Sequence, residues 1–315
     1  MIGLKKLAFI FPGQGAQAVG MGVDLFNNFD VAKKLFNDAD DALGYSIKNM
    51  CFDGPEDELR LTANTQPAIL VVSVIVSEIL KSEGITPSIA GGHSLGEYSA
   101  LVSAGVIDFQ DAVVLVHKRG QFMQEAVPVG EGAMAAIIGL DDQKIIDVCE
   151  RISQAVGIVE AVNFNCPGQT VIAGLTDAVE GAVEELKALG AKRSVILPVS
   201  APFHSQLMQS AAEKLAIELD KVKFNDAAFP IAANVNGALE TDAATIKNNL
   251  IEQTAHPVKW IECVNAMRGF GAEVFIEAGP GKTLCGFNRR IDRSIVSLNV
   301  ENVDSLNQTL AALRQ

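Results

Sequence analysis

The pentapeptide at 92–96, Gly-His-Ser-Leu-Gly, constrains the fold most, because it lies between a short apolar run at 89–92 and a helical run at 97–104. Glycines on both sides of Ser94 leave room for a sharp turn that exposes a hydroxyl group. The helix that follows directs its free N–H groups and the positive end of its dipole to the same point, so we expect the Leu95 N–H to meet an oxyanion there. The pattern predicts a strand, a nucleophile turn and a helix, as acyl transfer through a serine ester requires. A glycine-rich turn with an incidental serine is the alternative.

Apolar strands and amphipathic helices alternate along much of the chain, which predicts an α/β sheet covered on both faces. The strands expected in this sheet include 7–11, 89–92, 230–234, 273–276 and 295–298. The helices expected around it include 31–43, 67–80, 109–125 and 206–219. The fold class is therefore α/β, with a large α/β-hydrolase-like domain formed by residues 1–127 and 199–315.

The segment between these two parts has a pattern of its own and begins at the helix-breaking run Pro128-Val129-Gly130. Its expected elements are a strand at 133–140, a helix at 142–152, strands at 158–163 and 170–174, a helix at 177–189 and a strand at 193–198. That βαββαβ order is the ferredoxin-like unit. We expect residues 128–198 to form a small subdomain inserted in the larger domain.

Composition limits the partners and the compartment. The 315 residues carry 25 basic and 38 acidic side chains, a net charge of −13, which argues against nucleic acid as the main partner. The N-terminus has a basic pair and only a short apolar run, so it resembles a first strand and not a signal peptide. We expect no apolar run long enough to span a bilayer, and no membrane partner. The cysteines, odd in number and without a C-x-x-C pair, predict a reduced cytoplasmic protein without a metal site: Cys51, Cys149, Cys166, Cys263 and Cys285.

A serine nucleophile needs a base, and His204 is the best candidate among the four histidines. It lies in a loop ahead of the expected helix 206–219, and a histidine at a helix N-terminus is biased toward the neutral form that can take a proton. A histidine that only packs near a helix end is the alternative. His93 adjoins the nucleophile, but successive residues of a tight turn point apart, so packing or orientation fits it better. His117 lies inside a helix and is expected to be structural.

Arg119 interrupts an apolar stripe on the helix 109–125. The stripe consists of Ala112, Leu115, Val116, Phe122 and Met123. A guanidinium on a buried face needs an anion, and no acidic residue stands three or four positions away. The partner is therefore either a ligand carboxylate or a distant Asp or Glu.

Two glycine-rich loops invite a nucleotide-binding interpretation. Gly13 to Ala18 has the spacing of a dinucleotide fingerprint, but no second strand ending in an acid follows it. The Gln14 N–H in that loop could instead complete an oxyanion hole with Leu95. The run 279–283 imitates the end of a P-loop, yet Ile276 stands where the first glycine is required.

Taken together, these motifs resemble those of the malonyl-CoA:acyl-carrier-protein transacylase family of bacterial type II fatty acid synthesis and, more distantly, the acyltransferase domains of polyketide synthases. The resemblance covers essentially the whole chain. It rests on FPGQGAQ at 11–17, TQPAI at 65–69, GHSLGEYSALV at 92–102, Arg119-Gly120, NFNCPGQTVIAG at 163–174, PVSAPFHS at 198–205, Gln253, HPVKW at 256–260 and EAGPGK at 277–282. The family often has Ser where Ala16 stands, and Ser or Asn where Cys166 stands.

The resemblance implies a role for each site residue. Ser94 would be the nucleophile and His204 the base, oriented by the main-chain carbonyl of Gln253 in place of a triad carboxylate. The N–H groups of Gln14 and Leu95 would form the oxyanion hole. The residues that would bind the substrate are Arg119, as the clamp on the malonyl carboxylate, with Met123, His93, Asn163 and Phe203.

The resemblance further implies transfer of malonyl from malonyl-CoA to the pantetheine thiol of holo acyl carrier protein, by a ping-pong route through a malonyl-serine intermediate. Malonyl-CoA would then be a substrate, and no bound cofactor is expected; we also expect a monomer. Acyl carrier proteins are acidic, so Lys192-Arg193, Lys282 and Arg289-Arg290 are candidate landing sites, with solvated surface charge as the alternative. A serine hydrolase and a nucleotide-binding protein remain the rival interpretations.

Overall fold

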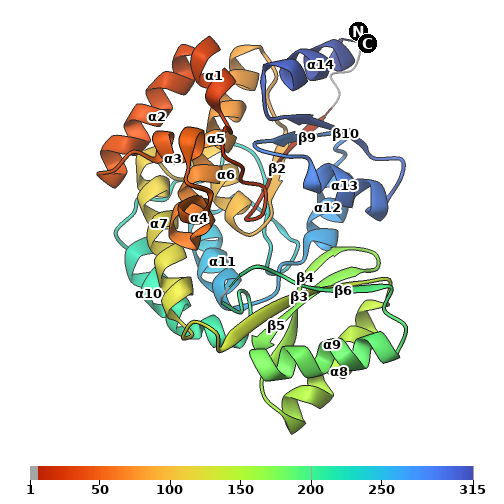
Figure 1. Cartoon of the computed structure of the whole chain (residues 1–315). Helices are drawn as coiled ribbons and strands as arrows, with labels where there is room; N and C mark the ends of the chain where they lie inside the picture. The colour runs from red at the N-terminus through yellow and green to blue at the C-terminus, as the bar shows by residue number, and fades with distance from the viewer. Residues whose placement is uncertain (1–5, 200, 315) are drawn as a thin grey trace.

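The computed structural model describes residues 6–199 and 201–314. Ser200, part of the expected loop 198–205, lies outside the described residues. The chain forms a large α/β unit and a smaller unit of four strands and two helices, which Figure 1 shows below it in green. The expected α/β fold class with a ferredoxin-like subdomain is confirmed.

The large sheet has six strands in the order β10-β9-β1-β2-β7-β8, and all neighbours are parallel except β7 and β8. Its strands are β1 (Leu7–Phe11), β2 (Ile89–Gly92), β7 (Ile231–Ala232), β8 (Leu239–Glu240), β9 (Val274–Ala278) and β10 (Val296–Val300). The expected strand 230–234 is thus only two residues long, because the chain turns at Asn234 toward the site.

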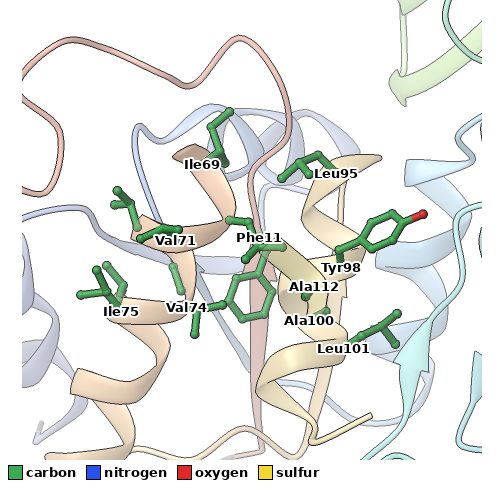
Figure 2. Packing of buried hydrophobic residues seen from close by; sticks show 14 of the residues in the cluster. Phe11, Ile69, Val71, Val74, Ile75, Leu95, Tyr98, Ala100, Leu101 and Ala112 are labelled. Carbon is green, nitrogen blue, oxygen red and sulfur yellow. The ribbon is translucent and has the colours of Figure 1, made fainter. Parts of the chain in front are cut away.

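Both faces of this sheet are buried, as the alternation along β1 shows. Phe9 and Phe11 belong to the apolar cluster on one face, whereas Ala8 and Ile10 belong to the cluster on the other. Figure 2 shows Phe11 beside side chains of α5 and α6 in the first cluster. The helices of the large unit are α1 (Val23–Asn28), α2 (Asp30–Leu43), α3 (Ile47–Asp53), α4 (Glu56–Arg60), α5 (Thr62–Ser82), α6 (Leu95–Ser103), α7 (Phe109–Glu125), α10 (Gln209–Leu219), α11 (Ala243–Ala255), α12 (Trp260–Gly269), α13 (Thr283–Ile291) and α14 (Val303–Leu313).

Helix α5 corrects two expectations. It begins at Thr62, five residues before Pro67, where the expected helix 67–80 began. By length and composition its 21 residues could also cross a membrane, so the expectation that no apolar run is long enough was wrong. In this fold 83% of its most apolar window is buried inside the protein, so its hydrophobicity serves the core. Pro67 cannot donate to the Ala63 carbonyl one turn earlier, and His117 Nδ1 lies 2.8 Å from that oxygen instead. His117 is therefore structural, as expected.

The smaller unit consists of β3 (Gly132–Ile138), α8 (Asp142–Ala155), β4 (Val159–Cys166), β5 (Gln169–Leu175), α9 (Thr176–Ala188) and β6 (Arg193–Ile196). Its antiparallel sheet has the order β4-β5-β3-β6. One face packs on α8 and α9, and the other contributes Met134, Val162 and Val171 to a cluster shared with Met123 and Phe203 of the large unit. The small sheet thereby covers one side of the site. The exact boundaries of the small subdomain, 128–198, stay a prediction.

The ends of neighbouring parallel strands bring the site together. Phe11, the last residue of β1, is paired with Gly92, the last residue of β2, so the loops after these two strands meet at one edge of the sheet. Strand β7 lies beside β2 and delivers Asn234 to the same edge. Gly96, the second residue of α6, approaches so closely that a Cβ there would lie 2.0 Å from the Phe11 carbonyl oxygen.

We therefore predict that Gly96→Ala lowers the free energy of unfolding by about 3 kcal/mol or prevents folding, because the clash is with backbone. Gly286→Ala is the matched control, since that glycine lies within α13 with open space around it. Alanine there should raise stability by up to about 1 kcal/mol. Urea unfolding of both variants measures the difference, and a Gly96→Ala protein as stable as the parent would contradict the packing described above.

Candidate active site

Ser94 occupies a strained turn between β2 and α6. Its φ of 51° and ψ of −105° are unusual for a residue with a side chain. Asn234 holds the turn from both sides: the Ser94 N–H donates to its Oδ1 at 2.7 Å, and its Nδ2 donates to the Gly92 carbonyl at 2.7 Å. A Cβ on Gly92 would lie 1.9 Å from the Gly96 carbonyl carbon, so the predicted need for glycines is steric.

The Ser94 hydroxyl lies 2.7 Å from His204 Nε2. His204 Nδ1 lies 2.8 Å from the main-chain carbonyl of Gln253, which can only accept a hydrogen bond, so Nδ1 carries the proton in the neutral ring. Nε2 is then free to accept from Ser94. The expected helix 206–219 is divided into a 3₁₀ turn, η1 (Gln206–Met208), and α10, so His204 precedes a short turn and not the long helix itself.

Burial and a neighbouring charge keep His204 neutral. The side chain is 3% exposed, and desolvation together with repulsion from the Arg119 guanidinium lowers the pKa of His204 to about 3. The hydrogen bond to the Gln253 carbonyl acts in the opposite direction but is outweighed. Neutral imidazole is the form that can remove a proton from Ser94.

Arg119 is 1% exposed and points at the same serine. Its Nη1 donates to Gln66 Oε1 at 2.7 Å, and its Nη2 donates to Gln253 Oε1 at 2.8 Å and to Ser94 Oγ at 3.2 Å. All three acceptors are neutral. Within residues 6–199 and 201–314 no carboxylate oxygen lies within 4.0 Å of the guanidinium, so the alternative of a direct ion pair is not observed there.

One cavity collects nearly all of the expected residues. Among the ten, only Gln253 stands behind the cavity wall, where it contacts Arg119 and His204. The wall consists of Gln14, His93, Ser94, Leu95, Arg119, Met123, Asn163, Phe203 and His204, together with four residues not predicted from the sequence, Gln66, Met134, Leu197 and Val199. A second cavity adjoins it and shares Gln14, His93, Asn163 and Leu197, so the site opens between the two units.

Two backbone N–H groups at this wall, those of Leu95 and Gln14, are available to bind an oxyanion. The Gly96 and Glu97 N–H groups donate to the carbonyls of His93 and Ser94, at 2.9 Å and 3.1 Å. In the described part of the chain, neither the Leu95 nor the Gln14 N–H has such an acceptor. The Gln14 side chain donates to Thr62 Oγ1 at 3.3 Å, which fixes the loop after β1.

His93 turns away from the serine, as expected for successive residues of a tight turn. Its Nε2 lies 2.7 Å from Asn165 Oδ1, and its ring lies 5.9 Å from that of Trp260. Burial lowers the pKa of His93, so it too is a neutral donor to Asn165. This arrangement ties the turn to strand β4 of the small sheet.

Three polar residues at the site were not predicted from the sequence to have a role. Gln66 and Glu97 lie inside quoted motifs, TQPAI and GHSLGEYSALV, and this was the only signal for them. Asn234 follows β7 and had none. Glu97 is 1% exposed, and burial raises the pKa of Glu97 to about 7 against the lowering effect of hydrogen bonds from Gln253 and Asn234.

The P-loop interpretation of 279–283 fails on geometry as well as on spacing. The Glu277 carboxylate accepts from the N–H groups of Leu284 and Cys285, at 3.1 Å and 2.8 Å, at the start of α13. A carboxylate already occupies the position that a phosphate would take. The loop after β1 likewise leads to α1 only at Val23, and not directly into a helix as a dinucleotide fingerprint would.

A serine on a strained turn, beside a neutral imidazole and free N–H groups, is the arrangement of enzymes that transfer acyl groups through a serine ester. The acyl transferase domain model matches residues 8–303. The chain is 46% identical to the malonyl CoA-acyl carrier protein transacylase of Bacillus subtilis (strain 168), over 99% of this chain and 98% of the relative. It is 49% identical to that of Escherichia coli (strain K12), over 91% and 93%.

Two solved structures agree with these matches. An acyl carrier protein S-malonyltransferase from Vibrio cholerae has a TM-score of 0.94 at 48% identity, covering 96% of this chain and 99% of that one. A malonyl-transacylase in complex with a type II polyketide synthase acyl-carrier protein has a TM-score of 0.95 at 45% identity, covering 98% and 99%. The chain belongs to the acyl transferase family, among the malonyl CoA-acyl carrier protein transacylases.

We predict that the His204 ring stays neutral from about pH 8 down to about pH 5, well below the usual imidazole midpoint. Because the Arg119 charge contributes to the low pKa, Arg119→Ala should raise the pKa of His204 and move its protonation to higher pH. Nitrogen NMR of histidine-labelled protein measures the pKa of His204 in the parent and in Arg119→Ala. The His204 resonances are those that disappear in His204→Asn. A parent midpoint near 6.5, or no change on removing Arg119, would contradict this electrostatic account.

Proposed function

We propose that this enzyme transfers the malonyl group of malonyl-CoA to the pantetheine thiol of holo acyl carrier protein through a malonyl ester on Ser94. The observation that carries the proposal is the contact of one hydroxyl with both a base and a cation: Ser94 Oγ lies 2.7 Å from His204 Nε2 and 3.2 Å from Arg119 Nη2. The first contact suits nucleophilic attack. The second suits an acyl group that itself carries a carboxylate.

In the first half-reaction, His204 Nε2 takes the Ser94 proton as Oγ bonds to the thioester carbonyl carbon. The N–H groups of Leu95 and Gln14 receive the oxyanion. The carbon–sulfur bond then breaks, and His204 returns its proton to the CoA thiolate. In the second half-reaction the pantetheine thiol gives its proton to His204 and attacks the ester, and Ser94 leaves with that proton.

Arg119 would select the acyl group. Its planar fork pairs with a carboxylate in two parallel hydrogen bonds, which an acetyl group cannot make. Met123 and Phe203 give the cavity apolar walls beside it, and the Asn163 carbonyl oxygen Oδ1 is buried without a partner among the described residues. We assign these three residues, with His93, to substrate binding on the strength of that placement.

The hydrolase alternative differs only in whether water or a thiol accepts the acyl group. α/β-Hydrolases orient their histidine with a carboxylate. Here the Gln253 carbonyl stands in that position, and the similar proteins are named transacylases. No observation favours hydrolysis over transfer.

The intermediate can be tested directly by intact-mass measurement after brief exposure to malonyl-CoA or acetyl-CoA. We expect a malonyl adduct that maps to Ser94, forms much more slowly from acetyl-CoA, and disappears on addition of holo acyl carrier protein. Ser94→Ala serves as the control and should give no adduct. An adduct that water removes as fast as the carrier protein does would point to the hydrolase.

Removal of the clamp should change selectivity more than rate. We expect Arg119→Ala to lower the malonyl-to-acetyl ratio of kcat/KM by about 100-fold, since a buried charge-assisted pair is worth roughly 1.5–3 kcal/mol. Quenched single-turnover measurements of adduct formation with each acyl-CoA give the malonyl-to-acetyl ratio. A variant that keeps its preference for malonyl would exclude Arg119 as the carboxylate partner.

We propose Lys192 and Arg193 as the landing site for the acidic carrier protein, because they stand at the start of β6, which leads to the cavity residue Leu197. Lys282 and Arg289 line a separate hollow on α13 and are a second candidate. Arg290 is a poorer one, since it binds Gln169 Oε1 and the carbonyls of Pro167 and Gly168 in the small unit.

Reversal of the charges at Lys192 and Arg193 should raise the KM for the carrier protein several-fold while adduct formation from malonyl-CoA is unchanged. The matched control reverses Lys33 and Lys34 on α2, which Figure 1 shows on the opposite side of the molecule. Steady-state transfer at low ionic strength measures both variants. An unchanged KM for the carrier protein would remove the pair from the interface.

The remaining expectations complete the proposal. We propose a monomeric, cytoplasmic enzyme. It needs no bound cofactor or metal, because acid–base chemistry at Ser94 and His204 accounts for every step above. Nucleic acid and membrane are not expected partners, and the net charge of −13 supports the first of these statements.

A further inference from the structure

Glu97 is a buried acid that the mechanism above does not use. It lies on α6 one turn after Ser94, and its Oε2 accepts hydrogen bonds from Gln253 Nε2 at 2.9 Å and from the Asn234 N–H at 3.1 Å. Burying a carboxyl group costs free energy unless the group is hydrogen-bonded, so a buried acid beside Ser94 needs a structural or functional explanation.

Glu97 orients the Gln253 side chain. The Gln253 amide donates from Nε2 to Glu97 Oε2 and to the Ser94 carbonyl at 3.0 Å. The Ser94 carbonyl can only accept a hydrogen bond, and Glu97 Oε2 already accepts one from the Asn234 N–H. The NH₂ end of the amide must therefore face them. The carbonyl end is left to face Arg119, whose Nη2 donates to it at 2.8 Å.

The neutral side-chain amide of Gln253 therefore lies between Arg119 and the Glu97 carboxyl group. A direct pair with Glu97 would occupy the guanidinium fork and leave less of it for a ligand carboxylate. The intervening amide fixes one nitrogen of Arg119 next to Ser94 while leaving the guanidinium without a carboxylate partner in the described structure. If the amide were reversed, its NH₂ group would face the guanidinium and push it away from the serine.

We propose that Glu97 is a positioning residue for acyl selectivity: acting through the Gln253 side chain, it holds Arg119 where the carboxylate of a dicarboxylic acyl group arrives beside Ser94. The inference rests on the proposed function and deepens it. It assigns the Gln253 side chain to selectivity, separately from the main-chain carbonyl that orients His204. The role needs an acceptor atom at Oε2, and both the ionised and the protonated carboxyl group supply one.

The test compares Glu97→Met, which removes the acceptor at similar size, with Glu97→Gln, which keeps an acceptor and removes the charge. The quantity measured is the malonyl-to-acetyl ratio of kcat/KM for adduct formation at Ser94. We expect the ratio to fall on the order of tenfold in Glu97→Met, which corresponds to about 1.4 kcal/mol, and to stay within about twofold of the parent in Glu97→Gln.

Two further variants make the result specific. Gln253→Met keeps the main-chain carbonyl that orients His204 but lacks the amide, so it should reproduce the fall in the ratio even if Glu97→Met does not fold. In the Arg119→Ala background, Glu97→Met should change the ratio no further, because its effect passes through Arg119. Thermal unfolding of each variant verifies that the protein compared is folded.

The outcomes separate the inference from the proposed function. If the parent forms no malonyl adduct at Ser94, the proposed function fails before any variant is made, and the inference fails with it. If the parent is selective but Glu97→Met and Gln253→Met lower malonyl and acetyl transfer by the same factor, Glu97 and the Gln253 amide are merely structural. A Glu97→Gln protein as unselective as Glu97→Met would show that charge matters and orientation does not, which also overturns the inference.

Discussion

The site depends on the backbone turn at Ser94. A residue with a side chain at φ 51° costs about 1–3 kcal/mol and persists only where its surroundings hold it. Here the surroundings are the close approach of Gly96 to the Phe11 carbonyl and the two hydrogen bonds with Asn234, which accepts from the Ser94 N–H and donates to the Gly92 carbonyl. Packing of α6 against β1 and α5, seen in Figure 2, supplies the force that keeps the turn in place. The exposed hydroxyl is therefore a product of the core.

Burial of charge is the second constraint, and it links His204 with Arg119. Arg119 is enclosed with neutral acceptors, and its repulsion adds to desolvation in keeping His204 neutral. A substrate carboxylate on Arg119 would compensate that repulsion. The imidazole could then hold a proton more readily after a carboxylated acyl group had arrived, when the reaction requires it to do so.

The local patterns predicted the architecture well where period and length were clear. Strand β1, the βαββαβ order of the small unit and helix α7 lie where the sequence placed them. The start of α5 was missed because Pro67 usually marks a helix beginning, and here His117 satisfies the carbonyl that the proline leaves unbonded. The length of α5 was also underestimated, since buried polar residues such as Thr62 and Gln66 interrupt its apolar pattern.

The sequence by itself determined the nucleophile turn, the candidate base and the isolated arginine, because each depends on residue type and on spacing within one or two turns of chain. Only the tertiary structure decided that Gln66, Asn234, Glu97 and the Gln253 side chain join them. These contacts connect the segment after β7 with α5, α6, α7 and α11, and they form because the parallel strands of the sheet end at a common edge. A hydrogen bond between residues more than a hundred positions apart has no local signature, since its geometry is fixed by the packing of the whole core and not by neighbours in the chain.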